Sequence, residues 1–255
     1  MTGRVLRFFA QLGVLALVTG ALGTRTSGES IKPARKMRIA LLDLPILASQ
    51  AVGEHRSHGQ TMVQEIEKVC ASRCEPLSVV LSQTGTDLTA QKYAEGLAEA
   101  LRLKADVIVI PSGARAGVHP LDEKRLSQAL GRAASRGVPV FVAAGTGLQN
   151  PFRPEPLSTL IPQKFNQAWV VAAAGTTPFE DETLRSAQNF GPELRFRVMA
   201  PSSSVAAVRL AAWVGRRLSE FRAQGRAHES LPALNRQLRR RFGVALPLSE
   251  LSRTD

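Results

Sequence analysis

Three side chains that together have the functional groups of an acyl-transfer site occur in the order Asp43, His58 and Ser204. Acyl transfer by a serine enzyme needs a hydroxyl nucleophile, an imidazole that accepts its proton, and a carboxylate that holds the imidazole in one tautomer. Each residue alone has an ordinary structural explanation, because Asp, His and Ser are all common at turns and helix starts. The elements that carry these residues therefore decide whether they form a site.

Short apolar runs predict five β-strands, and helical periodicity predicts five helices. We expect strands at 37–43, 77–81, 106–110, 138–142 and 169–173. We expect helices at 58–72, 88–103, 122–136, 204–222 and 231–241, and an irregular, loop-rich segment at 145–167. Strands that alternate with helices predict one α/β domain with a mostly parallel, doubly wound sheet and helices on both faces.

The three candidate residues fall where this fold concentrates its sites. Asp43 ends the first strand, His58 opens the helix after it, and Ser204 opens a later helix. In a doubly wound sheet the carboxyl ends of the strands, and the helix starts that follow them, lie along one edge. A serine at a helix start also has nearby backbone N–H groups that can stabilise an oxyanion.

Residues 1–23 have the pattern of a signal peptide. Arg4 and Arg7 precede an uncharged apolar stretch, Phe8 to Gly23, that ends in small residues. The stretch is short for a membrane span, so we expect cleavage near Gly23; the alternative is an uncleaved N-terminal anchor. Residues 24–36 are then a linker and 37–255 the folded domain. The protein is expected to be exported, periplasmic or secreted, with no stable membrane span after cleavage.

Export places Cys70 and Cys74 in an oxidising compartment, where a C-x3-C pair can close a small loop at a helix end. We expect a disulfide between them. No histidine follows at the spacing of a zinc ligand, so no metal site is expected. The sequence has neither the G-x-G-x-x-G nor the G-x-x-x-x-G-K-[ST] motif after a strand, which argues against a nucleotide, and we expect no cofactor.

Lys and Arg outnumber Asp and Glu by 33 to 21, a formal net charge of +12. Removal of residues 1–23 takes away two arginines and leaves 31 against 21, or +10. Aromatic residues make up only 5%, which argues against a protein that stacks nucleic-acid bases, so no nucleic-acid partner is expected. The segment 209–241 holds nine arginines and two glutamates. It is either a solvated helix surface or a binding surface for an anionic partner.

Several segments resemble, in the right order, the motifs of subtilisin-like serine proteases (subtilases). The resemblance covers residues 37–241, nearly all of the chain after the signal peptide. Its motifs are the Asp strand 39–43, the His motif 57–63, the substrate-pairing strand 105–113, the oxyanion strand 137–146, the run 189–201, the Ser helix 202–213 and the C-terminal helix 234–241.

The resemblance implies a subtilisin-like three-layer α/β sandwich and a serine endopeptidase that acts on a peptide or protein substrate. It assigns the nucleophile to Ser204, the general base to His58 and the orienting carboxylate to Asp43. It also implies that an extended peptide pairs with the main chain at Pro111, Ser112 and Gly113.

The oxyanion position of the family is occupied here by Thr146 instead of Asn. Loss of such a side-chain donor costs about 10²–10³ in turnover. The Thr146 hydroxyl or the nearby Asn150 are the candidate replacements. The alternative interpretation is a degenerate subtilase fold that binds a peptide or a partner protein and cleaves neither.

Overall fold

The computed structural model describes residues 35–43, 57–82, 87–116, 120–146, 154–226, 234 and 236–240. These belong to one compact unit, residues 34–255. The expected signal peptide, nearly all of the expected linker, Asn150 and parts of the expected helix 231–241 lie outside the described residues. None of the described helices combines the length and apolar character needed to cross a membrane.

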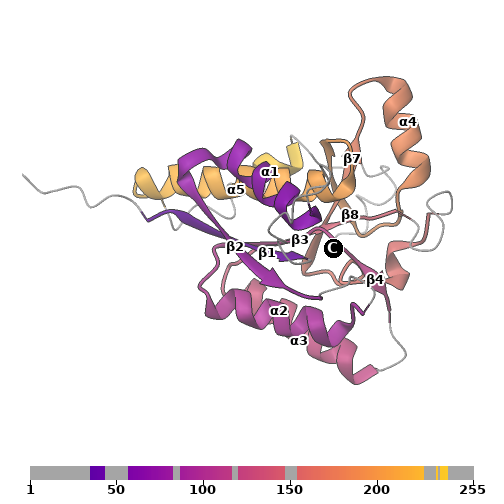
Figure 1. Ribbon diagram of the computed structural model, residues 1–255, viewed down its shortest axis with the longest axis horizontal. Coiled ribbons are helices and arrows are strands. Elements are labelled where there is room, and N and C mark those ends of the chain that lie inside the picture. Colours follow the sequence, from indigo (N-terminus) through magenta and orange to yellow (C-terminus); the bar gives the residue numbers. More distant parts are fainter. Residues whose placement is uncertain are drawn as a thin grey trace, which may run out of the picture. The chain divides into compact units, whose positions relative to one another are not determined.

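Six parallel strands form the main sheet (Figure 1). Their order is β2-β1-β3-β5-β7-β8, with bounds β1 Met37–Asp43, β2 Cys74–Val80, β3 Val107–Ile110, β5 Val140–Ala143, β7 Ala168–Ala174 and β8 Leu194–Met199. A small antiparallel pair joins β4 (Ala114–Arg115) to β6 (Leu160–Ile161). Because the strand order runs outward in both directions from β1, the sheet is doubly wound, and this confirms the predicted fold class.

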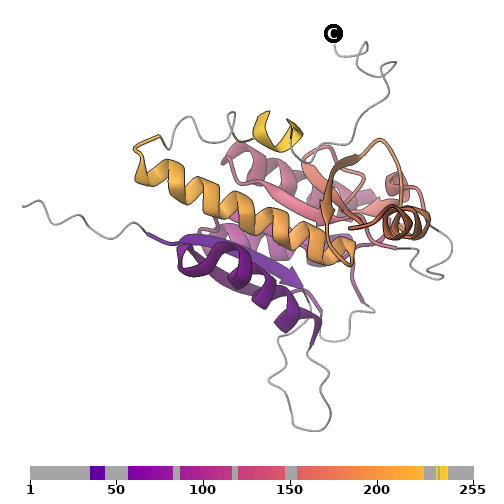
Figure 2. The ribbon, with the colours of Figure 1, turned by 90° about the horizontal axis from the view of Figure 1, so that it is seen from above.

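Helices cover both faces of the sheet and give three layers. On one face lie α1 (His58–Cys70) and α5 (Ser203–Ala223), and on the other lie α2 (Ala90–Arg102) and α3 (Pro120–Ser135) (Figure 1). Figure 2 shows α5 lying along the sheet beside α1. Side chains of β1 alternate between the two cores: Met37, Ile39 and Leu41 pack under α1 and α5, and Ala40 and Leu42 pack against α2 and α3.

Local capping fixes where the two functional helices begin. The Ser57 hydroxyl accepts a hydrogen bond from the Gln60 backbone N–H at 3.2 Å, and the Gln60 side chain accepts one from the Ser57 N–H at 3.1 Å. This capping box makes His58 the first residue of α1. The Ser202 hydroxyl accepts from the Val205 N–H at 3.3 Å, so that Ser204 lies in the first turn of α5.

The observed elements differ from the predicted ones in four places, one of which is the short strand β4, which was not predicted. Strand β2 begins at Cys74, three residues before the predicted start, after a single turn of 3-10 helix, η1 (Ala71–Arg73). The segment expected to be irregular contains a second such turn, η2 (Leu157–Thr159), and strand β6. Helix α4 (Pro178–Ala187) and strand β8 were not predicted.

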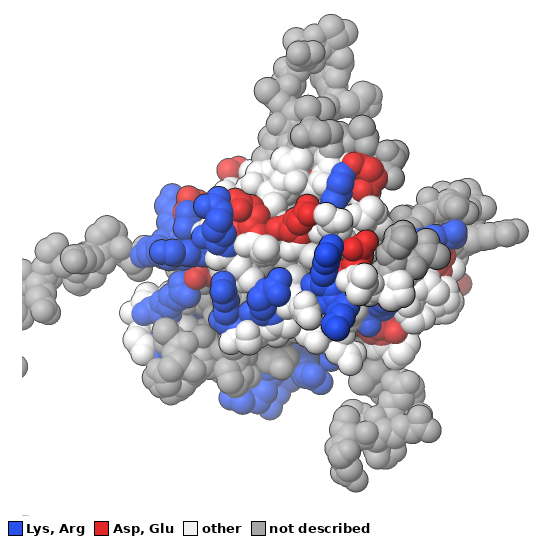
Figure 3. Space-filling view, turned by 90° about the horizontal axis from the view of Figure 1, so that it is seen from below, with Lys and Arg blue, Asp and Glu red and all other residues white. Residues whose placement is uncertain are grey.

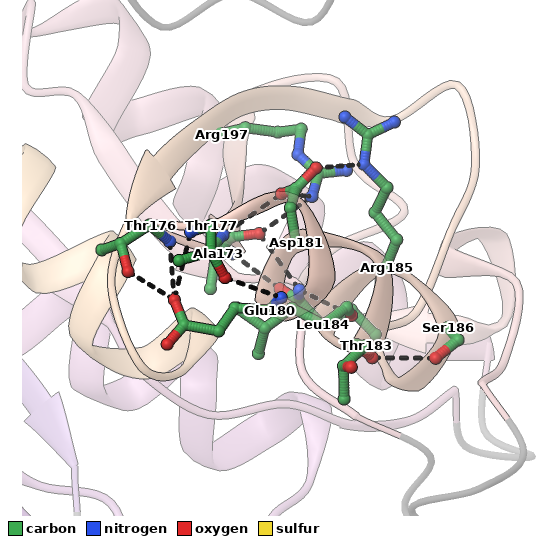
Figure 4. A network of polar contacts seen from close by, with 12 residues as sticks. Ala173, Thr176, Thr177, Glu180, Asp181, Thr183, Leu184, Arg185, Ser186 and Arg197 are labelled. Carbon is green, nitrogen blue, oxygen red and sulfur yellow. Dashed lines mark hydrogen bonds and ion pairs between the residues drawn. The ribbon is translucent and has the colours of Figure 1, made fainter.

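A polar network holds the unpredicted helix α4 against the unpredicted strand β8 (Figure 4). Asp181 of α4 accepts hydrogen bonds from the Gly175 N–H at 3.1 Å and from the Arg197 guanidinium of β8 at 2.9 Å. Gln188, just after α4, exchanges hydrogen bonds with the backbone of Ala173 in β7 at 2.6 and 3.1 Å. Polar contacts thus position α4, none of whose described side chains is fully buried.

Candidate active site

Asp43 is the last residue of β1 and lies on the sheet face that α1 and α5 cover, because it continues the alternation of Ile39 and Leu41. The residue is 3% exposed. Its Oδ2 lies 2.7 Å from Nδ1 of His58, and its Oδ1 has no partner among the described residues. A buried carboxylate is costly unless it is paired, so the His58 contact accounts for the placement of this charge.

His58 is held through one ring nitrogen only. With Nδ1 bound to Asp43, Nε2 is the nitrogen left to exchange a proton with another group. The hydrogen bond that His58 donates to Asp43 raises the pKa of His58 above its ordinary value; burial opposes this shift and the negative charge of Asp43 adds to it. The side chain is 40% exposed, so a substrate can reach the ring.

The Ser204 hydroxyl lies at the same sheet edge but is bonded to another group. Its Oγ donates to the backbone oxygen of Pro111, which follows β3, at 2.8 Å. Strand β3 pairs with β1, so Pro111 and Asp43 follow neighbouring strands. In the described part of the chain no hydrogen bond joins Ser204 to His58. The structure therefore brings Asp43 and His58 into contact and leaves Ser204 in a rotamer that would have to change for catalysis.

Ser203, which sequence analysis did not single out, ties the start of α5 to the loop after β5. Its buried hydroxyl accepts a hydrogen bond from the Gly145 N–H at 3.0 Å. Gly145 has φ +76°, a conformation that favours glycine, and Thr146 follows it. The three consecutive serines at 202–204 therefore have three different partners, namely the helix cap, the β5 loop and the Pro111 carbonyl.

Asn189 is a second residue that the sequence alone did not assign to the site. It is 3% exposed, and its amide donates to the backbone oxygens of Ala144 at 2.9 Å and Thr146 at 3.3 Å. Its Oδ1 accepts from the Glu155 N–H at 2.8 Å. Asn189 thus fixes the backbone of the oxyanion loop, while the exposed Thr146 side chain forms no hydrogen bond with a described residue.

Gln163 fills the space between the predicted substrate-pairing segment and β5. It is 1% exposed, and its Nε2 donates to Ala143 O at 2.8 Å and, more weakly, to Ser112 O at 3.4 Å. A Cβ added to Gly113 would lie 2.3 Å from the same nitrogen, so only glycine fits there with Gln163 in place. The Oε1 of Gln163 has no partner in the described part of the chain.

An apolar cavity of about 560 Å³ opens at the carboxyl ends of β7 and β8. Two of its side chains, Phe179 and Met199, are 79% and 59% exposed. Arg209 closes one side, held by Glu65 at 2.8 Å and by the Met199 carbonyl at 3.0 Å. The cavity therefore lies at the same sheet edge as the start of α5.

The two cysteines lie at disulfide distance, with their Cα atoms 5.6 Å apart, at the turn between α1 and β2. Both are buried. Within the described ranges no group of three or more His, Cys, Asp or Glu side chains could hold a metal ion.

No protein-family model matches this sequence, and no curated protein matches it either. Solved structures do share the fold. A lanthipeptide protease aligns with 15% identity and a TM-score of 0.61, over 80% of this chain and 79% of its own. The self-cleaved protease domain of PatA aligns with 18% identity and a TM-score of 0.56, over 79% and 86%.

A third similar structure is EpiP, the epidermin leader peptide processing serine protease from Staphylococcus aureus. It aligns with 8% identity and a TM-score of 0.55, over 78% of this chain and 69% of its own. At such low identities the likeness concerns the fold. This chain has the α/β fold of subtilisin-like proteases, with its parallel sheet between two helical layers.

Proposed function

We propose that this chain is an exported serine endopeptidase, a divergent subtilase that hydrolyses peptide bonds with Ser204, His58 and Asp43. The observation that carries the proposal is the buried Asp43 carboxylate 2.7 Å from His58 Nδ1, at the sheet edge where α5 presents Ser204. The fold shared with proteases, one of which processes a leader peptide, supports the same reaction class.

In the proposed reaction Ser204 Oγ attacks the peptide carbonyl carbon, and its proton passes to Nε2 of His58. Asp43 keeps the other ring proton on Nδ1 and stabilises the imidazolium. The imidazolium then protonates the leaving amine, the C–N bond breaks, and an ester forms between the acyl group and Ser204. Water, deprotonated by His58, hydrolyses this ester and restores the enzyme. Before the first step the Ser204 hydroxyl has to leave the Pro111 carbonyl.

The negative charge of the tetrahedral intermediate needs donors at the start of α5. The first N–H groups of a helix have no partner within the helix, and the dipole of this 21-residue helix is positive at that end. The Ser204 N–H and the exposed Thr146 hydroxyl are the proposed oxyanion donors. The peptide would pair with the backbone at Ser112 and Gly113, and the apolar cavity beside Met199 would take one of its side chains.

A second candidate function is peptide binding without cleavage. Two observations favour it: the Ser204 hydroxyl is bonded to Pro111 O rather than to His58, and the oxyanion position holds Thr146. In this function Asp43 and His58 would form a polar pair that shapes the binding surface.

Covalent labelling by a fluorophosphonate, measured by intact mass on the folded protein, tests the proposal. We expect one adduct per chain, lost in Ser204→Ala and retained in Ser203→Ala, because the Ser203 hydroxyl accepts the Gly145 N–H and is buried. An adduct that persists in Ser204→Ala would place the nucleophile elsewhere. A folded protein that forms no adduct, yet binds a peptide equally well after His58→Ala, would establish the second candidate instead.

Export is tested separately by the mass of the protein recovered outside the cytoplasm of an expressing bacterium. The proposal expects a chain that begins near residue 24. A chain retaining residues 1–23 would favour the uncleaved anchor.

A further inference from the structure

The second half of α5 carries more positive charge than its acidic neighbours balance. Glu220 is the shared partner of three arginines: Arg73 at 2.6 Å, Arg217 at 2.5 Å and Arg216 at 3.3 Å. Burial would raise the pKa of Glu220, but the hydrogen bonds from Arg217 and Arg216 outweigh it and hold the pKa below its ordinary value. The carboxylate therefore stays charged, and among the described residues three guanidinium groups share this one carboxylate, an excess of two positive charges.

Arg216, Arg217 and Glu220 line a pocket of about 450 Å³ between α5 and the helical segment 236–240. Its lining consists of Trp213, Arg216, Arg217, Glu220, Gln237 and Arg240. Arg240 adds a further guanidinium across the pocket. The Arg217 guanidinium lies 5.9 Å from the Trp213 ring centre, so a cationic wall adjoins an indole. A guanidinium group binds phosphate through two parallel hydrogen bonds to its oxygens. Tryptophan is common at the boundary between water and lipid.

The pocket lies beside residues 213–220 of α5, away from the start of this helix at the catalytic edge. Helix α5 begins at that edge and runs to the amino ends of the strands, where Arg222 contacts Met37 Sδ at 3.1 Å and Asp106 at 2.9 Å. Arg35, the first described residue, binds the same Asp106 at 3.1 Å.

We propose that the arginine pocket, lined by Arg216, Arg217, Arg240 and Trp213, binds the phosphate head groups of anionic phospholipids. The expected export route passes the protein through a membrane, and the arginines supply the positive charge that an anionic bilayer surface attracts. This proposal uses none of the residues assigned to catalysis.

The opposite face of the sheet provides the matched control. Figure 3 shows the side that carries α2 and α3, where Lys and Arg are interspersed with Asp and Glu. Arg125, Arg132 and Arg136 belong to α3 or directly follow it, and Arg125 pairs with Asp122 at 3.5 Å. Their replacement removes the same three charges from a surface that the proposal does not use.

The test is co-sedimentation with vesicles of phosphatidylcholine alone and of phosphatidylcholine mixed with phosphatidylglycerol. The readout is the affinity for the mixed vesicles divided by the affinity for phosphatidylcholine alone. Insertion of the apolar stretch 8–23 would contribute equally to both affinities, so it does not affect this ratio. Each arginine at an anionic surface contributes about fivefold in affinity, so Arg216→Gln/Arg217→Gln/Arg240→Gln is expected to lower the ratio about a hundredfold. Arg125→Gln/Arg132→Gln/Arg136→Gln is expected to change it less than about threefold.

Glu220→Gln keeps the proposal testable if the triple variant unfolds, and removes only the central carboxylate. It is expected to raise the ratio about fivefold, with folding checked by thermal unfolding. The proposal is overturned by equal binding to both vesicles, by an equal loss in the α3 control, or by no gain in Glu220→Gln. Displacement by millimolar inorganic phosphate, or tighter binding to a DNA duplex at the same salt, would also overturn it in favour of a soluble anion or a nucleic acid.

Discussion

Asp43→Asn is the substitution that tests the proposed mechanism most directly. The carboxylate is 3% exposed and its Oδ2 lies 2.7 Å from His58 Nδ1. Asparagine has nearly the same volume, so the core beneath the end of β1 is preserved. An amide at this position can donate its N–H to Nδ1, which moves the ring proton to Nε2 and blocks the nitrogen that has to accept the Ser204 proton.

The expected loss follows from that change of tautomer. A triad whose aspartate becomes asparagine loses about 10⁴ in turnover, or about 5 kcal/mol of transition-state stabilisation. The rate of fluorophosphonate labelling should fall by a similar factor, because labelling uses the same nucleophile and base. Asp122→Asn is the matched control, since Asp122 lies on α3, across the sheet from His58, and its pair with Arg125 at 3.5 Å is partly exposed.

The same substitution changes the pKa of His58 in a defined direction. Asp43 raises that pKa through its hydrogen bond and its charge, and burial lowers it. Without the carboxylate only burial remains, so the pKa should fall below its ordinary value of 6.5. His58 has to be neutral to act as the base, so activity is lost as the pH falls through its pKa. The midpoint of this loss should lie above pH 6.5 in the wild type and shift to lower pH in the variant.

Stability should follow the same linkage. The folded-state pKa of His58 is raised, so the stabilisation that the protonated ring gains from Asp43 is complete below the unfolded pKa and disappears as the pH rises through the folded one. The difference in stability between wild type and Asp43→Asn should therefore shrink with rising pH. NMR titration of the histidine rings, assigned with His58→Ala, measures the pKa. An unchanged labelling rate together with an unchanged His58 pKa would refute the assigned roles.

Three further substitutions test other parts of the site. Thr146→Asn adds an amide donor to the loop that Asn189 holds, and we expect peptide turnover to rise by about 10²; an unchanged rate would show that this side chain does not contact the oxyanion. Gln163→Ala empties the buried space beside Ser112. Two peptides are compared, one with a bulky residue and one with alanine immediately before the cleaved bond, and kcat/KM should rise more for the bulky one. An equal change in kcat/KM for the two peptides would contradict this. Cys70→Ala/Cys74→Ala should lower the free energy of unfolding by about 2 kcal/mol, because the cysteines are only four residues apart; urea unfolding with and without reductant measures this, and a wild type insensitive to reductant would argue against the bond.

Local patterns were sufficient for most of the fold. The run Val107–Ile110 is buried on both faces, and helix α2 presents one apolar face to the core, so both were predicted from their periodicity. Strand β8 alternates Leu194, Phe196 and Val198 with arginines, a period-two signal that was present but not used. Helix α4 is held by polar contacts to β8 and to the backbone of β7. Its capping box, Thr177 with Glu180, and Pro178 at the first helical position are the sequence signals that mark its start.

The sequence by itself determined the α/β fold, the position of Asp43 at a strand end, and the starts of the helices that carry His58 and Ser204. These follow from periodicity and capping, which act between residues a few positions apart. Only the tertiary structure decided which groups meet through space. The Ser204 hydroxyl binds Pro111, 93 residues away, and Arg73 reaches Glu220 across 147 residues. Such contacts depend on how the packed layers bring distant side chains together, and no local pattern encodes that geometry.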